Sequence, residues 1–255
     1  MSYDKGLFLY LTMAKRRRKK KSTRIPVFLF ISTLIVGGYF AFQYFNKKNV
    51  TPIKFNELPS FPEGFKSYGI DISHHQDEVD WDLFSEHNDS TIKFIYCKVS
   101  EGVDLTDRQW RKNHSALQRL KLPHGGYHFF RPNSDPEKQA ENFLAHYMSF
   151  EKSLPPALDV EIEDNSDSEL ILKMKIWLKI VEKKTGKRPI IYTSYHFYSK
   201  KFEGEFDNYK FWIASYSDKS HRLKNKQIIH WQFSEKGKIP GIKGFVDLNY
   251  SKIEF

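Results

Sequence analysis

From Ser67 onward, short apolar runs alternate with longer stretches of helical spacing. The apolar runs are rich in β-branched and aromatic residues, which is typical of strands. They lie at residues 68–73, 92–100, 124–130, 154–163, 189–194, 210–216, 228–234 and 245–250. Apolar residues recur with helical spacing at 107–121, at about 135–148 and most clearly at 168–184, which Gly186 and Pro189 follow.

This alternation of about eight strands with helices predicts an α/β fold. The helical stretches become short or vanish after Pro189, whereas the strand-like runs continue. We therefore expect an irregular TIM-like (β/α) barrel with reduced helices in its C-terminal part, where hairpins join the last strands. The single cysteine, Cys97, lies in an apolar run and is expected to be a buried, small hydrophobic residue. With one cysteine, no disulfide within the chain is possible.

A different pattern precedes this domain. Residues 25–45 carry no charged side chain over 21 positions, and an unbroken basic run at 15–21 lies shortly before them. A helix of this length spans about 31 Å, close to the hydrocarbon thickness of a bilayer. The pattern predicts one transmembrane helix over 25–45, an uncleaved signal-anchor, with residues 1–24 as a cytoplasmic basic segment. A cleaved signal peptide is the alternative, although the apolar region ends in aromatic rather than small residues.

The charge distribution agrees with this division. The formal net charge is +10, but residues 1–48 contain eleven Lys or Arg and one acid, so the rest of the chain is neutral overall. This balance argues against a nucleic-acid partner. Residues 46–66 are polar and contain three prolines, which predicts a tether. Residues 67–255 are then expected to form a domain outside the cytoplasm, held at the cell membrane.

The stretch at 154–163, LPPALDVEIE, combines apolar residues with paired acids. In a strand, Asp159 and Glu161 project from one face, and Leu158, Val160 and Ile162 from the other. On an open sheet the acidic face could be solvated. In a core strand, two acids facing inward need a function, and glycoside hydrolysis requires such a pair.

Four acids are expected to converge in such a barrel. Asp71, Asp159, Glu161 and Asp247 all lie late in, or shortly after, a strand-like run, and active sites of (β/α) barrels form at the carboxyl ends of the strands. Closing the barrel makes the first strand, with Asp71, a neighbour of the last, with Asp247. Packed carboxylates repel one another, which raises the pKa of at least one and supplies a proton donor near neutral pH.

The sequence resembles glycoside hydrolase family 25, the Chalaropsis-type lysozymes, from residue 67 to 255. The opening motif D-x-S-x-x-Q is matched by Asp71, Ser73 and Gln76. The resemblance rests on GIDISHHQ at 69–76, KVSEG at 98–102, GYHF at 126–129, LDVE at 158–161, IYT at 191–193, WIA at 212–214, WQFS at 231–234 and GFVDLN at 244–249. One departure is the loop after Gly102, VDLTDRQW, where the family more often has an aromatic residue before the Asp.

The resemblance implies an N-acetylmuramidase that hydrolyses the β-1,4 bond between N-acetylmuramic acid and N-acetylglucosamine in peptidoglycan, without a cofactor. It implies that Glu161 is the general acid and that Asp159 orients the N-acetyl group of the substrate, whose carbonyl oxygen attacks the anomeric carbon. Asp71 and Asp247 would hold the sugar and tune the charge of the pair. Alternatives stay open: Asp71 as a cap of the following turn, Asp247 as a structural residue, and the protein as a non-catalytic glycan-binding module or a glycosidase of chitin-like chains.

Further residues are candidates for contacts with the glycan. Aromatic side chains stack on sugars, but in strands they belong to the core equally often. The candidate substrate-binding residues are Tyr127, Tyr192, Trp212, Trp231 and Gln232. His74, His75 and His128 lack the spacing of metal ligands, so no metal site is predicted. The expected partners are peptidoglycan glycan strands, and we expect a monomer.

Overall fold

The computed structural model describes residues 51–148, 150, 153–217 and 223–255. The predicted basic segment and the predicted transmembrane helix, residues 25–45, lie outside the described residues. Within the described part of the chain, no helix is both long and apolar enough to cross a membrane. Residues 51–255 make up one folded unit.

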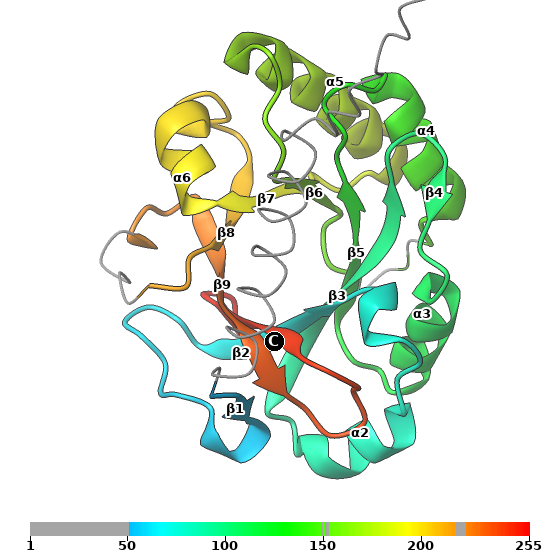
Figure 1. The fold of residues 1–255 in the computed structure, drawn as a ribbon, viewed down its shortest axis with the longest axis vertical. Helices are drawn as coiled ribbons and strands as arrows, with labels where there is room; N and C mark the ends of the chain where they lie inside the picture. Colours follow the sequence, from blue (N-terminus) through cyan, green and yellow to red (C-terminus); the bar gives the residue numbers. More distant parts are fainter. Residues whose placement is uncertain (1–50, 149, 151–152, 218–222) are drawn as a thin grey trace, which may run out of the picture. The chain divides into compact units, whose positions relative to one another are not determined.

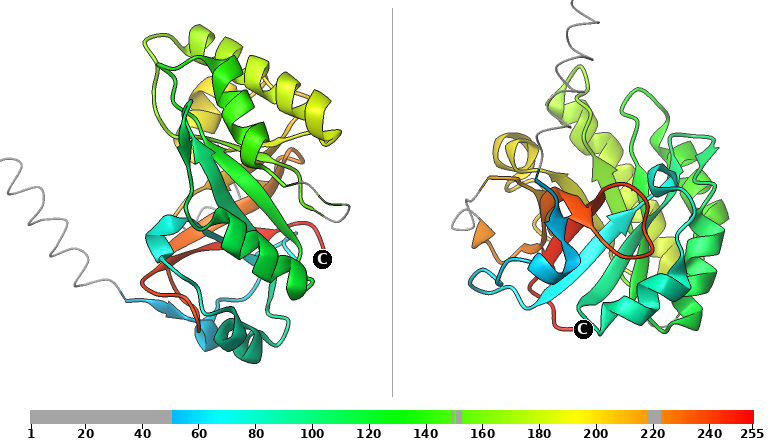
Figure 2. Two further views of the ribbon diagram at one scale, coloured as in Figure 1. Left: turned by 90° about the vertical axis from the view of Figure 1, so that its right-hand side faces the viewer. Right: turned by 60° about the horizontal axis from the view of Figure 1, so that its bottom comes forward.

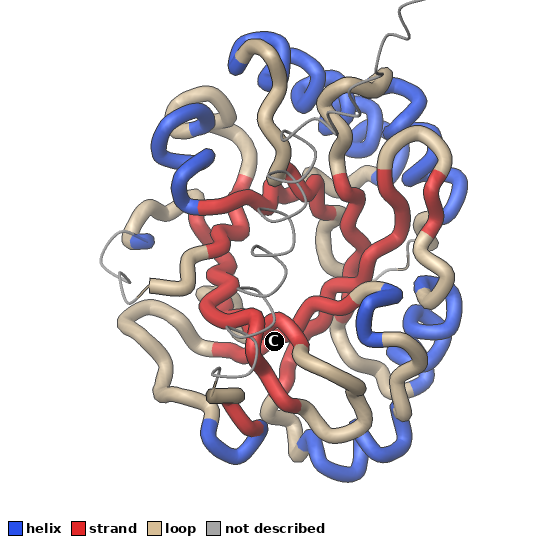
Figure 3. Tube along the Cα trace, viewed as in Figure 1, coloured by secondary structure: helices blue, strands red, loops and turns tan. Residues whose placement is uncertain are grey.

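Eight strands of this unit close into a barrel (Figures 1 and 3). In order around the barrel they are β2 (Ser67–Ile72), β3 (Ile92–Glu101), β5 (His124–Phe129), β6 (Ala157–Val160), β7 (Ile190–Ser194), β8 (Lys210–Ala214), β9 (Ile228–Lys238) and β10 (Val246–Ser251). Seven of them run parallel, and β10 runs antiparallel to both of its neighbours, β9 and β2. The predicted barrel and the hairpin between its last two strands are therefore confirmed.

The longer helices cover the outside of the barrel between β2 and β7. They are α2 (Trp81–Asn88), α3 (Trp110–Arg119), α4 (Pro136–His146) and α5 (Asp167–Thr185). Figure 2 shows α3, α4 and α5 outside the strands. After β7 the described helices are only short, α6 (Tyr195–Phe197) and η3 (Tyr198–Phe202), as the sequence predicts. The best-predicted helix, α5, starts where the Ser166 side chain accepts a hydrogen bond from the Glu169 backbone and ends at Gly186, whose φ is +69°.

Alternation along the strands separates two apolar clusters. On β3, Ile95, Cys97 and Val99 face the helices and belong to the larger cluster. Phe94 and Tyr96 point the other way and join Trp212 inside the barrel, where the Tyr96 and Trp212 ring centroids lie 4.9 Å apart. These rings close the barrel below its carboxyl end, so the interior is a packed core rather than a channel.

Two short strands and two single-turn helices complete the described elements. The strand β4 (Leu105–Thr106) pairs with the end of β3, and β1 (Ile53–Lys54) runs parallel to the end of β9. The turns are η1 (Phe55–Glu57) and η2 (His74–Gln76).

The predicted tether does not extend to residue 66. From Thr51 on, the chain packs against the barrel: β1 joins β9, and Phe65 lies 5.7 Å from the Trp231 ring, centroid to centroid. The ring centroids of Phe61 and Tyr68 lie 4.3 Å apart. The prolines of this stretch indicated an extended linker, but its aromatic side chains bind it to the core, so the folded unit begins before Ser67.

Candidate active site

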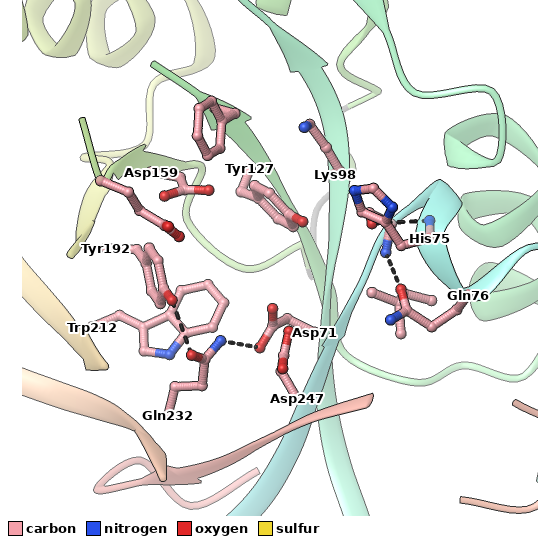
Figure 4. A pocket seen from close by; sticks show the side chains of 14 residues that line it. Asp71, His75, Gln76, Lys98, Tyr127, Asp159, Tyr192, Trp212, Gln232 and Asp247 are labelled. Atoms are coloured by element: carbon pink, nitrogen blue, oxygen red, sulfur yellow. Dashed lines mark hydrogen bonds between the residues drawn. The ribbon is translucent and has the colours of Figure 1, made fainter. Parts of the chain in front are cut away.

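A cavity opens at the carboxyl end of the parallel strands, and the four predicted acids line it (Figure 4). The residues around it are Asp71, Ile72, Ser73, His75, Gln76, Lys98, Tyr127, Phe129, Asp159, Glu161, Tyr192, Trp212, Gln232 and Asp247. Three of the acids lie at the ends of β2 and β6. Asp247 instead lies at the start of β10, so the prediction that it comes late in its strand is wrong. It reaches the same end of the barrel because β10 runs in the opposite direction.

Asp71 and Asp247 are direct cross-strand partners of β2 and β10. Asp71 Oδ2 accepts hydrogen bonds from Gln232 Nε2 at 3.0 Å and from Asn249 Nδ2 at 2.8 Å, and Asp247 donates a further one to Asp71. Burial raises the pKa of Asp71 to about 6, although these donors oppose the rise. Burial and then the charge of Asp71 raise the pKa of Asp247 to about 9. At neutral pH the pair therefore holds one proton, on Asp247.

Asp159 and Glu161 form the second pair. Asp159 is buried in the barrel mouth, whereas Glu161 is exposed at the end of β6. Burial, followed by the nearby charge of Glu161, raises the pKa of Asp159 well above its usual value. Although Glu161 is exposed as a residue, the cavity wall partly desolvates its carboxyl group and raises its pKa, while hydrogen bonds with Asp159 and Tyr192 and the charge of Lys98 oppose the rise. Asp159 Oδ1 is buried and has no hydrogen-bond partner among the described residues.

Gln232 links the acids to the aromatic wall. Its Oε1 accepts hydrogen bonds from the Tyr192 hydroxyl at 2.9 Å and the Tyr216 hydroxyl at 2.7 Å. Because both donors bind the oxygen, the Nε2 group is directed at Asp71 (Figure 4). Tyr216 was not among the predicted residues.

The other predicted substrate-binding residues divide between cavity and core. Tyr127, Tyr192 and Trp212 line the cavity, and the Trp212 indole donates a hydrogen bond to Asn249 Oδ1 at 2.7 Å. Trp231 does not line it. The Trp231 ring packs against Phe65, and its indole N–H donates a hydrogen bond to the Ser215 carbonyl. Trp231 therefore lies in the core, and its position disagrees with the prediction that it binds the sugar. Neighbouring residues of a strand face opposite sides, and on β9 the inward position belongs to Gln232.

The structure excludes Asp71 as the cap of the turn after β2. The turn after β2, η2, is capped by Ser73, whose hydroxyl accepts from the His75 backbone, while Gln76 Oε1 accepts from the Ser73 backbone. Asp71 takes no part in this capping box. Gln76 also donates to the Phe245 carbonyl at 3.0 Å, which ties the turn to the start of β10.

Sequence reasoning left several lining residues out of the site: Ser73, His75, Gln76, Lys98 and Phe129. For Lys98 a signal existed, since it continues the inward face of β3 two residues beyond Tyr96. Within the described residues, no group of three or more His, Cys, Asp or Glu is arranged to hold a metal ion. Of the histidines considered, His74 contacts Asp107 at 2.8 Å, and His128 contacts Ser100 at 2.9 Å.

Comparisons with known proteins agree with one another on the family to which this chain is similar. The family model described as "Glycosyl hydrolases family 25" matches residues 70–242. The protein YegX of Escherichia coli O6:H1 is 35% identical over 191 residues, which cover 74% of this chain and 70% of that protein. The autolytic lysozyme of Clostridium acetobutylicum is 27% identical over 182 residues, 71% of this chain and 54% of the lysozyme.

A solved structure is similar to this one in fold. It is the family 25 glycosyl hydrolase of Bacillus anthracis, with a TM-score of 0.67 and 25% sequence identity. The match covers 76% of this chain and 93% of the other.

Proposed function

The chain belongs to glycosyl hydrolase family 25, and we propose that it is a lysozyme. The reaction is the hydrolysis of the β-1,4 bond between N-acetylmuramic acid and N-acetylglucosamine in peptidoglycan. The observation that carries the proposal is the convergence of four carboxyl groups from three strands on one cavity. A structural role would not gather two pairs of acids whose pKa values are all raised.

Glu161 is the proposed general acid. Its raised pKa makes this carboxyl group easier to protonate than an ordinary glutamate, and its exposed position just after β6 lets a glycan reach it. It protonates the glycosidic oxygen of the leaving sugar, and its carboxylate then removes a proton from the attacking water.

Asp159 is proposed to orient the acetamido group of the substrate, whose carbonyl oxygen attacks the anomeric carbon. This substrate-assisted route needs no nucleophile from the protein. The buried Oδ1 without a partner supports the proposal, because the acetamido N–H is a donor that it could accept from. An ionised Asp159 would also stabilise the positive charge that develops as the acetamido ring closes.

The protonation of this pair must change when the glycan binds. In the free protein Asp159 donates a hydrogen bond to Glu161, which places the shared proton on the more deeply buried group. The reaction needs that proton on Glu161. When the acetamido N–H becomes a new donor to Asp159, it stabilises the anionic form of Asp159, and the proton can pass along the existing hydrogen bond to Glu161.

Asp71 and Asp247 are proposed to hold the sugar at the opposite wall of the cavity. Gln232 and Asn249 fix the Asp71 carboxylate, and Asp247 presents a protonated carboxyl at neutral pH. Because the Asp247 proton is donated to Asp71, both groups offer acceptor oxygens to the cavity, which suits the hydroxyl groups of a sugar. Tyr127, Tyr192 and Trp212 are proposed to supply its aromatic wall.

The proposal extends to the location of the protein. We propose a single-pass protein of the cell membrane, anchored through residues 25–45, with the cytoplasm on the side of residues 1–24 and the catalytic domain outside. The support is the basic run at 15–21 next to the uncharged stretch. The domain is proposed to act as a monomer.

The product of the reaction tests the function. Purified peptidoglycan is incubated with the full-length protein, and the new reducing ends are identified by mass spectrometry after borohydride reduction. Reduced N-acetylmuramic acid supports the proposal, whereas N-acetylglucosamine ends contradict it. If the protein binds the glycan but releases no new ends, it is a binding module. Glu161→Gln serves as the matched control for contaminating lysozyme.

A further inference from the structure

A lysine lies among the carboxyl groups of the cavity, and the mechanism above gives it no role. Lys98 is the single Lys or Arg among the described residues that line the cavity, and 8% of it is exposed. Burying an ammonium group costs hydration free energy, so its position needs a compensating interaction. Its Nζ lies 2.5 Å from Glu101 Oε2 and 4.9 Å from the centre of the Phe129 ring.

The counter-ion of Lys98 is itself held in place. Arg131 donates to Glu101 Oε1 through both Nε and Nη2, and the Arg131 guanidinium lies 4.8 Å from the same Phe129 ring. Asn142, on α4, donates to the carbonyl oxygens of Gly102 and Leu105 and so fixes the turn that follows Glu101. Glu101 is therefore a rigid anchor that sets the position of the Lys98 ammonium.

The surroundings of Lys98 show what its charge acts on. The titratable and charged groups that face it from the neighbouring elements are His74 and His75 after β2, Glu101 on β3, Asp107 and Arg108 before α3, Tyr127 and Arg131 on or after β5, Asp159 and Glu161 on or after β6, and Asp71 and Asp247 across the cavity. His128 lies on the opposite, helix-facing side of β5, within range of the Lys98 charge. For Asp159 and Glu161, burial raises the pKa and Lys98 is the cation that lowers it.

We propose that Lys98 is a positioning residue for the acid pair: its ammonium, held by Glu101, keeps one of Asp159 and Glu161 ionised while the other retains its proton. This role rests on the proposed function. Without a cation at the cavity wall, burial would favour two neutral carboxyls, and Asp159 could not stabilise the positive charge of the closing ring. With a cation that Glu101 did not balance, the pair would tend to lose its proton, and Glu161 could not act as an acid.

The test uses the opposite effects that removing Lys98 and removing Glu101 should have on the pH dependence of the reaction. The dependence of kcat on pH is measured with soluble peptidoglycan fragments and the full-length protein. Lys98→Met removes the cation, so both carboxyl pKa values rise and the whole profile moves to higher pH, by about one unit. Glu101→Gln removes the balancing anion and moves the profile to lower pH. Lys98→Arg keeps the charge and restores the wild-type profile.

An exposed ion pair on the outside of the barrel provides matched controls. Lys112 Nζ lies 3.2 Å from Glu78 Oε1, and both side chains are largely exposed. Lys112→Met and Glu78→Gln make the same chemical changes and leave the profile in place, because solvent screens these charges.

Three results would overturn the proposal. An unchanged pH profile of Lys98→Met with a raised KM would make Lys98 a substrate anchor. Shifts in the same direction for Lys98→Met and Glu101→Gln would indicate a shared structural role. A shift in the Lys112→Met or Glu78→Gln controls would show that any change of charge has this effect. Failure of the Lys98 proposal can be told apart from failure of the proposed function. If the wild-type protein itself does not hydrolyse peptidoglycan, the proposed function is refuted.

Discussion

Replacing Asp247 by asparagine should stabilise the protein, and the gain should depend on pH. The pKa of Asp247 is raised from 3.8 to about 9 in the folded protein. A carboxyl group with a raised folded pKa takes up a proton on folding, so stability falls as pH rises from about 3.8 to about 9. An asparagine side chain at this position would need no proton, and its amide could still donate to the Asp71 carboxylate.

The size of the effect follows from the same values. At pH 7 the unfolded Asp247 is ionised, and protonating it costs about 1.36 kcal/mol for each pH unit above its ordinary pKa, or roughly 4 kcal/mol. This is an upper value, because the side chain is partly exposed in the cavity and water stabilises its charged form. We expect Asp247→Asn to raise the free energy of unfolding by about 2 to 4 kcal/mol at pH 7 and by less than about 1 kcal/mol at pH 4.

Urea unfolding at pH 4, 5.5, 7 and 8.5 measures this difference, with the slope m checked for constancy. The control is Asp207→Asn, which changes an exposed carboxyl group and should leave stability within about 0.5 kcal/mol at every pH. A gain that is equal at pH 4 and pH 7 would refute the reasoning, since it would mean that Asp247 does not take up a proton on folding. A loss of stability at pH 7 would refute it as well.

Three further predictions concern the core and the topology. Gly69→Ala should lower the free energy of unfolding by roughly 1–3 kcal/mol in urea titrations, because the new Cβ would lie 2.3 Å from the Phe94 ring; unchanged stability would contradict this packing. Trp231→Phe should lower the melting temperature but leave KM unchanged, whereas a rise in KM with normal stability would return Trp231 to the substrate site. A reporter fused after Phe255 should be active only outside the cytoplasm, in the membrane fraction; a soluble secreted form lacking residues 1–45 would indicate a cleaved signal.

The strand-like runs could be predicted from local periodicity, and the set of acids from their place near the ends of those runs together with the family motifs. The place of Asp247 within its strand was predicted wrongly. The rule for the carboxyl ends of parallel strands was applied to it, although the predicted hairpin makes the last strand antiparallel, and Asp247 reaches the site from the start of β10. The helix α2 was missed because only Trp81, Phe84 and Asn88 of its eight residues are buried, which leaves a weak apolar pattern.

Side-chain direction limited the prediction of the cavity wall. Trp231 and Gln232 are adjacent, so only one of them can face inward, and an irregular register earlier in β9 makes the choice impossible from alternation alone. Lys98 could have been found, since it shares a face with Phe94 and Tyr96. It was passed over because a lysine in an apolar strand is ordinarily taken to end at the surface.

The proposed lysozyme activity depends above all on Glu161 as the group that donates the proton to the leaving sugar. The most direct measurement is the turnover of Glu161→Gln on purified peptidoglycan, with glycan binding and the melting temperature measured on the same sample. We expect a fall in kcat of at least about 10²–10⁴-fold, with binding retained and a melting temperature at or above that of the wild type. Asp159→Asn should behave alike. Near-normal turnover of Glu161→Gln would contradict the assignment of the acid, and failure of both variants to fold would make the pair structural.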